Sequence, residues 1–357
     1  MRNTRQVMCG NVPIGGGAPL SIQSMCNTDT RDPRASLEQI ERLVDAGCQI
    51  IRLAIPDMEA AKGFGEIKKR CPIPMVADIH FDYRLAIAAI DNGADKIRIN
   101  PGNIGSEDRV RAVLERAKAA KIPVRIGVNS GSLEKDIVAK YHGVTAEGMC
   151  ESALKAVKYC ESFGFEDIVV SLKTTDVAMN HKAHKLFCEQ SDRPLHIGLT
   201  ESGAGRMAEI KSTAALGALI LDGIGDTMRI SLTGDPLREV LLAKEVLAAV
   251  GARKLGIDFV SCPTCGRTKV DLPAIAQMIE KRLTPLSEKL AKSGKFIRVA
   301  VMGCEVNGPG EAKEADFGVA SGKGEGLILA HGQIIKKVPE DKIADELIAE
   351  IEKNVLI

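Results

Sequence analysis

Pro74-Met-Val-Ala-Asp-Ile79 and Lys96-Ile-Arg-Ile-Asn100 are two short runs rich in strand-forming residues, and a stretch with a helical pattern separates them. The same alternation of short strand and amphipathic helix runs from about residue 20 to residue 250. Neighbouring parallel strands need a crossover connection, which is usually a helix, whereas antiparallel neighbours can be joined by short turns. This stretch therefore predicts an α/β domain built on a parallel sheet.

The repeat contains about eight such units. We expect the strands at Leu20–Met25, Gln49–Ile55, Pro74–Ile79, Lys96–Asn100, Pro123–Val128, Asp167–Leu172, Leu195–Leu199 and Met228–Leu232. The clearest helices are Ser36–Ala46, Ser106–Ala120, Ala146–Phe163 and Leu237–Val250. Eight units in about 250 residues favour a closed (β/α)8 barrel, the TIM barrel, over a doubly wound open sheet.

A different pattern begins after Val250. Gly251–Gly256 has the composition of a short linker, and Cys262-Pro-Thr-Cys265 that of a tight turn. Helices are expected at Leu272–Leu283 and Pro339–Lys353, and strands at Phe296–Met302, Asp316–Ala320 and Gly326–Ala330. The sequence thus predicts two domains: a substrate-binding barrel over residues 1–250 and a small α+β domain over residues 259–357.

Composition argues against nucleic-acid and membrane partners and indicates the cellular compartment. Lys and Arg number 48 against 47 Asp and Glu, so no overall field attracts nucleic acid or an anionic membrane. The first residues lack the apolar core of an export signal, and no stretch approaches the roughly 18 apolar residues of a membrane span. We therefore expect a cytoplasmic protein whose ten cysteines are thiols rather than disulfides.

Basic residues end five of the predicted strands inside otherwise apolar runs: Arg52, Arg98, Arg125, Lys173 and Arg229. Burying an unpaired cation is costly, and in a barrel the carboxyl ends of all strands meet at one mouth. With Asn129 and Ser231 nearby, the set predicts a site for a polyanionic small molecule, most simply a diphosphate. The alternative is that each cation pairs with a barrel carboxylate, such as Asp78, Asp95 or Glu201.

Two further polar features lie at predicted strand ends. Asp78 and His80 are on the same side of one strand end and would suit proton transfer, although a satisfied core histidine is equally compatible. Glu201 precedes a glycine-rich turn into a helix, where it could present a carboxylate to the mouth.

The C-terminal domain carries the sharpest signal, the pair Cys262 and Cys265 together with Cys304. Two cysteines separated by two residues can reach one metal centre, and a third completes a three-point attachment. A structural zinc site needs a fourth ligand, for which His331 or an acid would have to serve. A cubane cluster held by three thiolates leaves one iron open, so we favour an iron–sulfur site over zinc.

These motifs together resemble the bacterial 4-hydroxy-3-methylbut-2-enyl diphosphate synthases of the non-mevalonate isoprenoid route. The similarity runs over essentially the whole chain, without departure at the motif positions. It is carried by Ser21-Ile-Gln-Ser-Met25, Val76-Ala-Asp-Ile-His-Phe81, Ile99-Asn-Pro-Gly-Asn-Ile104, Arg125-Ile-Gly-Val-Asn-Ser-Gly-Ser132, Gly198-Leu-Thr-Glu-Ser-Gly203, Ser261-Cys-Pro-Thr-Cys-Gly-Arg267 and Asn307-Gly-Pro-Gly-Glu311.

The resemblance implies the reductive opening and dehydration of 2-C-methyl-D-erythritol 2,4-cyclodiphosphate. It implies a [4Fe-4S] cluster held by Cys262, Cys265 and Cys304, with Glu311 as a displaceable fourth ligand, and Glu201 as the acid beside the reacting carbons. It also implies the diphosphate ligands Arg52, Arg98, Arg125, Asn129, Lys173, Arg229 and Ser231. Flavodoxin or ferredoxin would supply two electrons.

The short connection between the domains suggests a head-to-tail homodimer, as the resemblance also implies, because a cluster domain tethered behind its own barrel cannot easily reach that barrel's mouth. The sequence is also compatible with two other functions. One is a sugar-phosphate lyase or epimerase with a structural zinc site, and the other is a redox sensor without catalytic activity.

Overall fold

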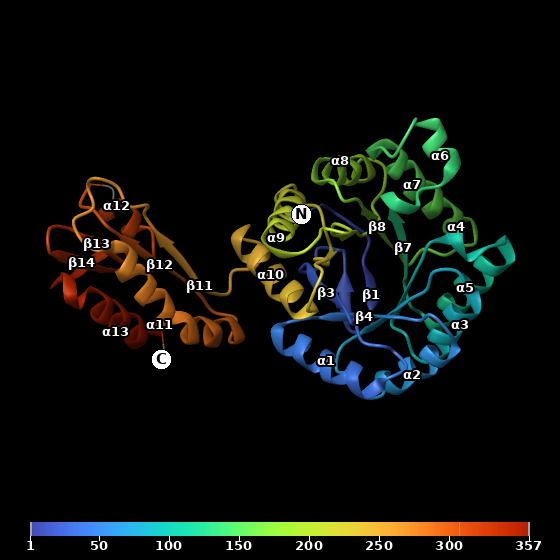
Figure 1. Ribbon diagram of the computed structural model, residues 1–357, viewed down its shortest axis with the longest axis horizontal. Helices are drawn as coiled ribbons and strands as arrows, with labels where there is room; N and C mark the ends of the chain where they lie inside the picture. The colour runs from blue at the N-terminus through green and yellow to red at the C-terminus, as the bar shows by residue number, and fades with distance from the viewer. Residues whose placement is uncertain (1, 307, 356–357) are drawn as a thin grey trace. The chain divides into compact units, whose positions relative to one another are not determined.

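The computed structural model describes residues 2–306 and 308–355. The chain divides into two compact units, Met1–Val250 and Gly251–Ile357 (Figure 1). Among the described residues, no helix combines the length and the apolar character that a membrane crossing requires.

The first unit is a closed parallel barrel. Its sheet has the order β8-β7-β6-β5-β4-β3-β10-β9, every pair is parallel, and a bridge between Val170 and Leu195 joins the first strand to the last. The TIM-barrel prediction is confirmed, and the open sheet is excluded by this closure. The strands are β3 (Ser21–Met25), β4 (Ile50–Ala54), β5 (Met75–Asp78), β6 (Lys96–Ile99), β7 (Val124–Asn129), β8 (Ile168–Lys173), β9 (His196–Ile197) and β10 (Thr227–Met228).

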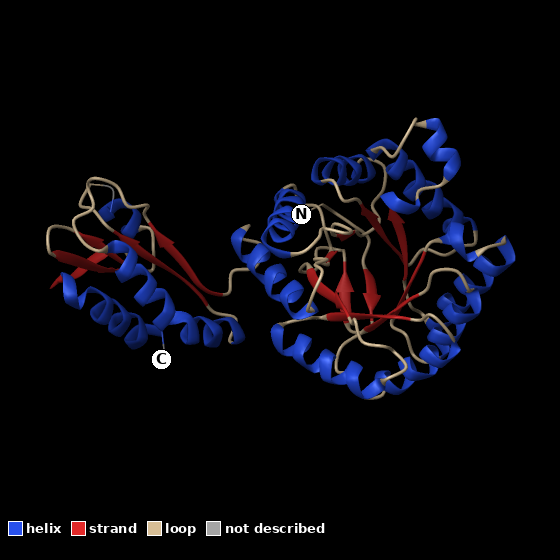
Figure 2. Cartoon of the chain, in the orientation of Figure 1, coloured by secondary structure: helices blue, strands red, loops and turns tan. Residues whose placement is uncertain are grey.

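Helices surround these strands (Figure 2). Several begin at an aspartate whose carboxylate accepts a backbone N–H of the first turn, as Asp32, Asp57 and Asp235 do. Their apolar faces cover the outside of the sheet and form the main core. The helices are α1 (Pro33–Ala46), α2 (Met58–Lys68), α3 (Tyr83–Asp91), α4 (Pro101–Ile104), α5 (Glu107–Ala120), α6 (Lys135–Lys140), α7 (Ala146–Ser162), α8 (Val177–Cys188), α9 (Gly205–Leu221) and α10 (Pro236–Ala249).

The predicted strands at Leu195–Leu199 and Met228–Leu232 are shorter than expected. Each pairs over only two residues, as β9 and β10. A side chain at Gly198 would place its Cβ 2.4 Å from the carbonyl oxygen of Arg229 and 2.8 Å from Nζ of Lys173. Glycine at this point lets backbone and amine approach closely where the two strands leave the sheet.

A small hairpin, β1 (Val7–Cys9) and β2 (Val12–Ile14), was not predicted. Its buried side chains Val7, Cys9 and Ile14 pack against Ile50, Val76 and Val169, which lie near the start of β4, β5 and β8. The hairpin therefore closes the amino-terminal end of the barrel with an apolar floor.

The second unit is a five-stranded sheet of order β11-β12-β13-β14-β15 covered by helices. The first three strands are parallel and the last two pairings are antiparallel. Its elements are β11 (Gly256–Ser261), α11 (Leu272–Lys292), β12 (Phe296–Met302), α12 (Gly308–Lys313), β13 (Phe317–Ser321), β14 (Glu325–Ala330), β15 (Gln333–Pro339) and α13 (Ile343–Val355). The predicted α+β class is confirmed, while β11 and β15 were missed and α11 is longer than expected.

Candidate functional site

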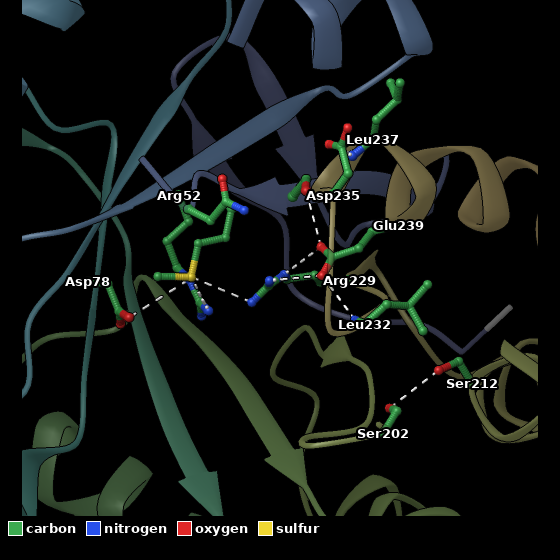
Figure 3. Close-up of polar contacts among 12 residues, drawn as sticks. Arg52, Asp78, Ser202, Ser212, Arg229, Leu232, Asp235, Leu237 and Glu239 are labelled. Atoms are coloured by element: carbon green, nitrogen blue, oxygen red, sulfur yellow. Dashed lines mark hydrogen bonds and ion pairs between the residues drawn. The ribbon is translucent and has the colours of Figure 1, made fainter. Parts of the chain in front are cut away.

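The barrel lumen contains a group of cations, of which Arg52 and Arg229 are seen in Figure 3. Arg52 on β4 places Nε 3.0 Å and Nη2 2.8 Å from Sδ of Met25, and Nη1 of Arg229 lies 3.5 Å from the same sulfur. Arg98 and Arg125 are register partners on β6 and β7. The structure thus brings these arginines, predicted from separate strands, into one lumen.

Two carboxylates form ion pairs with these cations. Asp78 lies 3.4 Å from Arg98 and 3.9 Å from Arg52, and Glu239 lies 3.1 Å from Arg229. Burial alone would raise the pKa of Asp78, but the positive charge of Arg52, a hydrogen bond with His80 and the charge of Arg98 together hold that pKa below its usual value. Asp78 is therefore an anion that aligns two arginines rather than a proton donor.

Arg125 and Lys173 form no ion pair with any described residue, and both are buried. Nε and Nη1 of Arg125 have no hydrogen-bond partner among the described atoms. Burial, followed by repulsion from Arg52 and Arg98, lowers the pKa of Arg125. For Lys173, burial and then the charge of Arg125 lower the pKa in the same way.

The alternative of pairing with carboxylates therefore holds for Arg52, Arg98 and Arg229 but not for Arg125 and Lys173. Asp95 accepts a hydrogen bond from the backbone of Met75 at 2.7 Å and pairs with Lys68, outside the set. Glu201 forms no ion pair among the described residues. Five cations consequently face two carboxylates, which leaves a positive surplus in a desolvated lumen.

The remaining predicted residues lie around the mouth. Asn129 ends β7 and Ser231 follows β10, both partly buried, while His80 is exposed beyond β5 with Nε2 3.5 Å from Asp78. Glu201 is exposed and has a φ of 51°, a left-handed conformation that is unusual without glycine. It borders a cavity of about 350 Å³ together with Ser130 and Thr174.

We expect Arg125→Met to weaken binding of a diphosphate by about 1.5–3 kcal/mol, the usual cost of losing a charge-assisted hydrogen bond. Methionine keeps most of the volume, so packing around β7 should survive. Titration calorimetry with inorganic pyrophosphate measures the change, and Arg116→Ala, which removes an exposed arginine paired with Asp91, is the matched control. If the Arg125 variant and the parent bind pyrophosphate with equal affinity, this arginine has a structural role and does not bind the anion.

The second unit gathers the predicted cysteines at one end of its sheet. Cys262 directly follows β11 and Cys304 lies just beyond β12, and the last register pair of these parallel strands is Ser261 with Val301. The backbone N–H of Gly303 donates to Sγ of Cys262 at 3.2 Å. All ten cysteines are described and none forms a disulfide, as expected.

Cys265 lies on the exposed turn between β11 and α11, where its backbone N–H donates to Oγ1 of Thr268 at 3.2 Å. Hydrogen bonds from the backbone and then the side chain of Arg267 lower the pKa of Cys265. Glu311 is exposed in the first turn of α12. No three His, Cys, Asp or Glu side chains of residues 2–306 and 308–355 are close enough to hold a metal ion as they stand. The donor types nevertheless fit a thiolate-ligated cluster, because Cys262 and Cys304 lie at the same edge of the sheet and Cys265 lies on the exposed turn that follows Cys262.

Sequence reasoning missed Glu239 and Met25. Glu239 is buried on α10, accepts from the backbone N–H of Leu232 at 3.1 Å and binds Arg229. A carboxylate on the core-facing side of the expected helix Leu237–Val250 was the available signal. Met25 gave no signal, because a thioether at a strand end resembles any core residue.

Two family models match this chain. The model described as the GcpE TIM-barrel domain matches residues 4–244, and that of the GcpE protein C-terminal domain matches residues 258–353. The proteins named 4-hydroxy-3-methylbut-2-en-1-yl diphosphate synthase (flavodoxin) from Geobacter sulfurreducens and Caldanaerobacter subterraneus are each 53% identical, over 98% and 99% of this chain and 97% of their own.

Solved structures show the fold alone. Dihydropteroate synthases from Yersinia pestis and Xanthomonas albilineans superpose with a TM-score of 0.50 at 13% and 14% identity, covering 69% of this chain and 97% of each of theirs. At such identity the similarity concerns the barrel and not its chemistry. The family models and the curated relatives cover both units, and the chain therefore belongs to the GcpE family of 4-hydroxy-3-methylbut-2-en-1-yl diphosphate synthases.

Proposed function

We propose that this protein reductively opens 2-C-methyl-D-erythritol 2,4-cyclodiphosphate and releases water, giving (E)-4-hydroxy-3-methylbut-2-enyl diphosphate. The observation that carries the proposal is the surplus of lumen cations, five against two carboxylates. A desolvated positive site of this kind is complementary to a diphosphate. Membership of the family adds the reaction class.

The lumen residues hold and orient the substrate. Arg52, Arg98, Arg125, Lys173 and Arg229 would bind the diphosphate oxygens, with Asn129 and Ser231 as neutral donors at the rim. Asp78 and Glu239 fix three of the arginines before substrate arrives, so little ordering entropy is lost on binding. The diphosphate is thereby anchored with the carbon skeleton directed toward the mouth.

Glu201 is positioned to act on the carbon skeleton. Its left-handed backbone places an exposed carboxylate beside the cavity lined by Ser130 and Thr174. A carboxylic acid at that place can donate a proton to a departing oxygen. We assign Glu201 this role, while Nε2 of His80 lies 3.5 Å from Asp78.

Cys262, Cys265 and Cys304 would hold a [4Fe-4S] cluster, with Glu311 as an exchangeable fourth ligand. When bound, such a cluster supplies single electrons and a Lewis-acidic iron. Gly303 orients Cys262 by its N–H, and Arg267 does the same for Cys265. The relatives carry flavodoxin in their names, so flavodoxin is the donor that we propose.

The active assembly would be a head-to-tail homodimer in which the cluster domain of one chain serves the barrel of the other. Six residues separate the end of α10 at Ala249 from the start of β11 at Gly256. A helix that follows a barrel strand runs away from the mouth, and six residues reach about 21 Å at most. A tether this short supports an arrangement in which the two domains of a site come from different chains.

The proposed function predicts electron-dependent turnover. The anaerobically purified protein with reduced flavodoxin should convert the cyclic diphosphate to the allylic diphosphate, measured by phosphorus NMR. Glu201→Gln should lower kcat by at least about 100-fold while pyrophosphate affinity stays close to that of the parent, because only the ionisable group is lost. Iron-loaded protein that binds the substrate yet gives no product with any reductant would refute the proposal, and stoichiometric zinc with no iron would favour the lyase reading.

A further inference from the structure

A second group of polar side chains lies deeper in the lumen, beneath the arginines. Side chains two residues apart on a strand face the same side, so Lys96 shares the lumen face with Arg98, and Gln23 shares it with Met25. His196 on β9 is affected by the charges of Arg125 and Lys96, which places it in the same interior. TIM-barrel interiors are usually filled with layers of branched apolar residues, so these positions are exceptional.

These deeper groups lack protein partners. Nζ of Lys96, both amide atoms of Gln23 and both ring nitrogens of His196 make no hydrogen bond to any described atom. Lys96 and His196 have no exposed surface, and Gln23 is 1% exposed. Buried polar atoms without protein partners are normally satisfied by ordered water or by a ligand.

Lys96 is the exceptional member of this group, because it carries a charge. Its register partner on β5 is Val76, a residue of the apolar floor, and the groups whose charges act on Lys96 are the thiol of Cys9 and the cations Arg125 and Arg52. No carboxylate is among them. Burial, opposed only by Cys9 and reinforced by the two arginines, lowers the pKa of Lys96 to about 8.

Such a residue weakens the empty protein. A buried amine without a counter-ion loses hydration, and its two cationic neighbours repel it. Methionine at this position would fill a similar volume without either penalty. The charge of Lys96 therefore does not stabilise the fold. A polyanion bound above it would instead make the electrostatic interaction of its ammonium favourable.

We infer that Lys96 is a positioning residue for the anion, acting from beneath Arg52, Arg98 and Arg125 through its charge and through ordered water rather than by direct contact. This inference rests on the proposed function, since it takes the diphosphate as the occupant of the upper lumen. Lys96 lies two residues before Arg98, about 6.6 Å lower on the strand, and its four-carbon stem spans a similar length. Its ammonium therefore remains within strong Coulombic range of a diphosphate held by the arginines.

The test compares stability with affinity in the full-length holoenzyme. Lys96→Met should raise the melting temperature of the ligand-free protein and at the same time weaken inorganic pyrophosphate binding roughly tenfold, as expected for one charge acting over about 10 Å. Lys96→Gln, which keeps a polar group but loses the charge, should show the same loss of affinity. Lys62→Met removes the same charge from the exposed face of α2 and should change neither quantity.

The outcomes separate this inference from the function on which it rests. If the parent protein does not bind pyrophosphate, the diphosphate site itself is wrong. If the parent binds and both Lys96 variants bind equally well, the inference alone is overturned. It is also overturned if both variants lose stability together with affinity, because that result describes a structural lysine.

Discussion

Replacing Cys304 by serine is expected to abolish iron binding and turnover together. The hydroxyl is a poor ligand for iron, and two thiolates cannot hold a cubane cluster alone. Cys304 lies just beyond β12, next to Gly303, whose backbone N–H donates to Sγ of Cys262, so the change removes one of the three proposed thiolate ligands. Iron and sulfide analysis after anaerobic reconstitution, with the visible absorption of the cluster, measures the effect. Cys262→Ser and Cys265→Ser should behave in the same way.

The matched control is Cys71→Ser in the barrel. The thiol of Cys71 is partly buried and already donates to the carbonyl oxygen of Ile73 at 3.2 Å, a contact that a hydroxyl reproduces. Iron content and activity should be unchanged. Glu311→Ala should retain most of the iron but release it faster, because the thiolates hold the other three irons. Full iron content in the Cys304 variant would refute the assignment of the ligands.

The second large effect tests the proposed dimer, and here the expected result is a recovery of activity. Cys304→Ser and Glu201→Gln chains should each be inactive alone, but their coexpression should restore about a quarter of the parent activity. Random pairing makes half of the dimers mixed, and a mixed head-to-tail dimer holds one site with both residues intact. Activity is measured on the purified mixture, with two different affinity tags used to isolate the mixed dimer.

A chain carrying both substitutions, coexpressed with the parent, is the control for this experiment. In that mixed dimer each site contains one altered residue, so no activity should come from it. Absence of activity in the isolated Cys304→Ser and Glu201→Gln mixed dimer would mean that each cluster serves its own barrel.

The barrel and the convergence of its cations could be predicted because both follow from local patterns. The alternation around residues 74–100 requires a parallel sheet, and a parallel barrel directs Arg52, Arg98 and Arg229 to one end. The partners of these arginines could not be predicted equally well. Asp78 was among the expected acids, whereas Glu239 reaches Arg229 from α10, through a packing contact that no strand pattern encodes.

The missed strands have a common physical origin. β1 and β2 are three residues each, and β11 begins at Gly256, which has a φ of 77° and looks like part of the linker. β15 is mostly exposed, so its sequence has little apolar alternation. These strands are stabilised by pairing with distant segments, and short windows of sequence do not report such contacts.

The floor made by Val7, Cys9 and Ile14 turns the lumen into a blind-ended well rather than a tunnel. If the diphosphate binds among the lumen cations as proposed, substrate and product must enter and leave through the same opening, so the product has to leave before the next substrate binds.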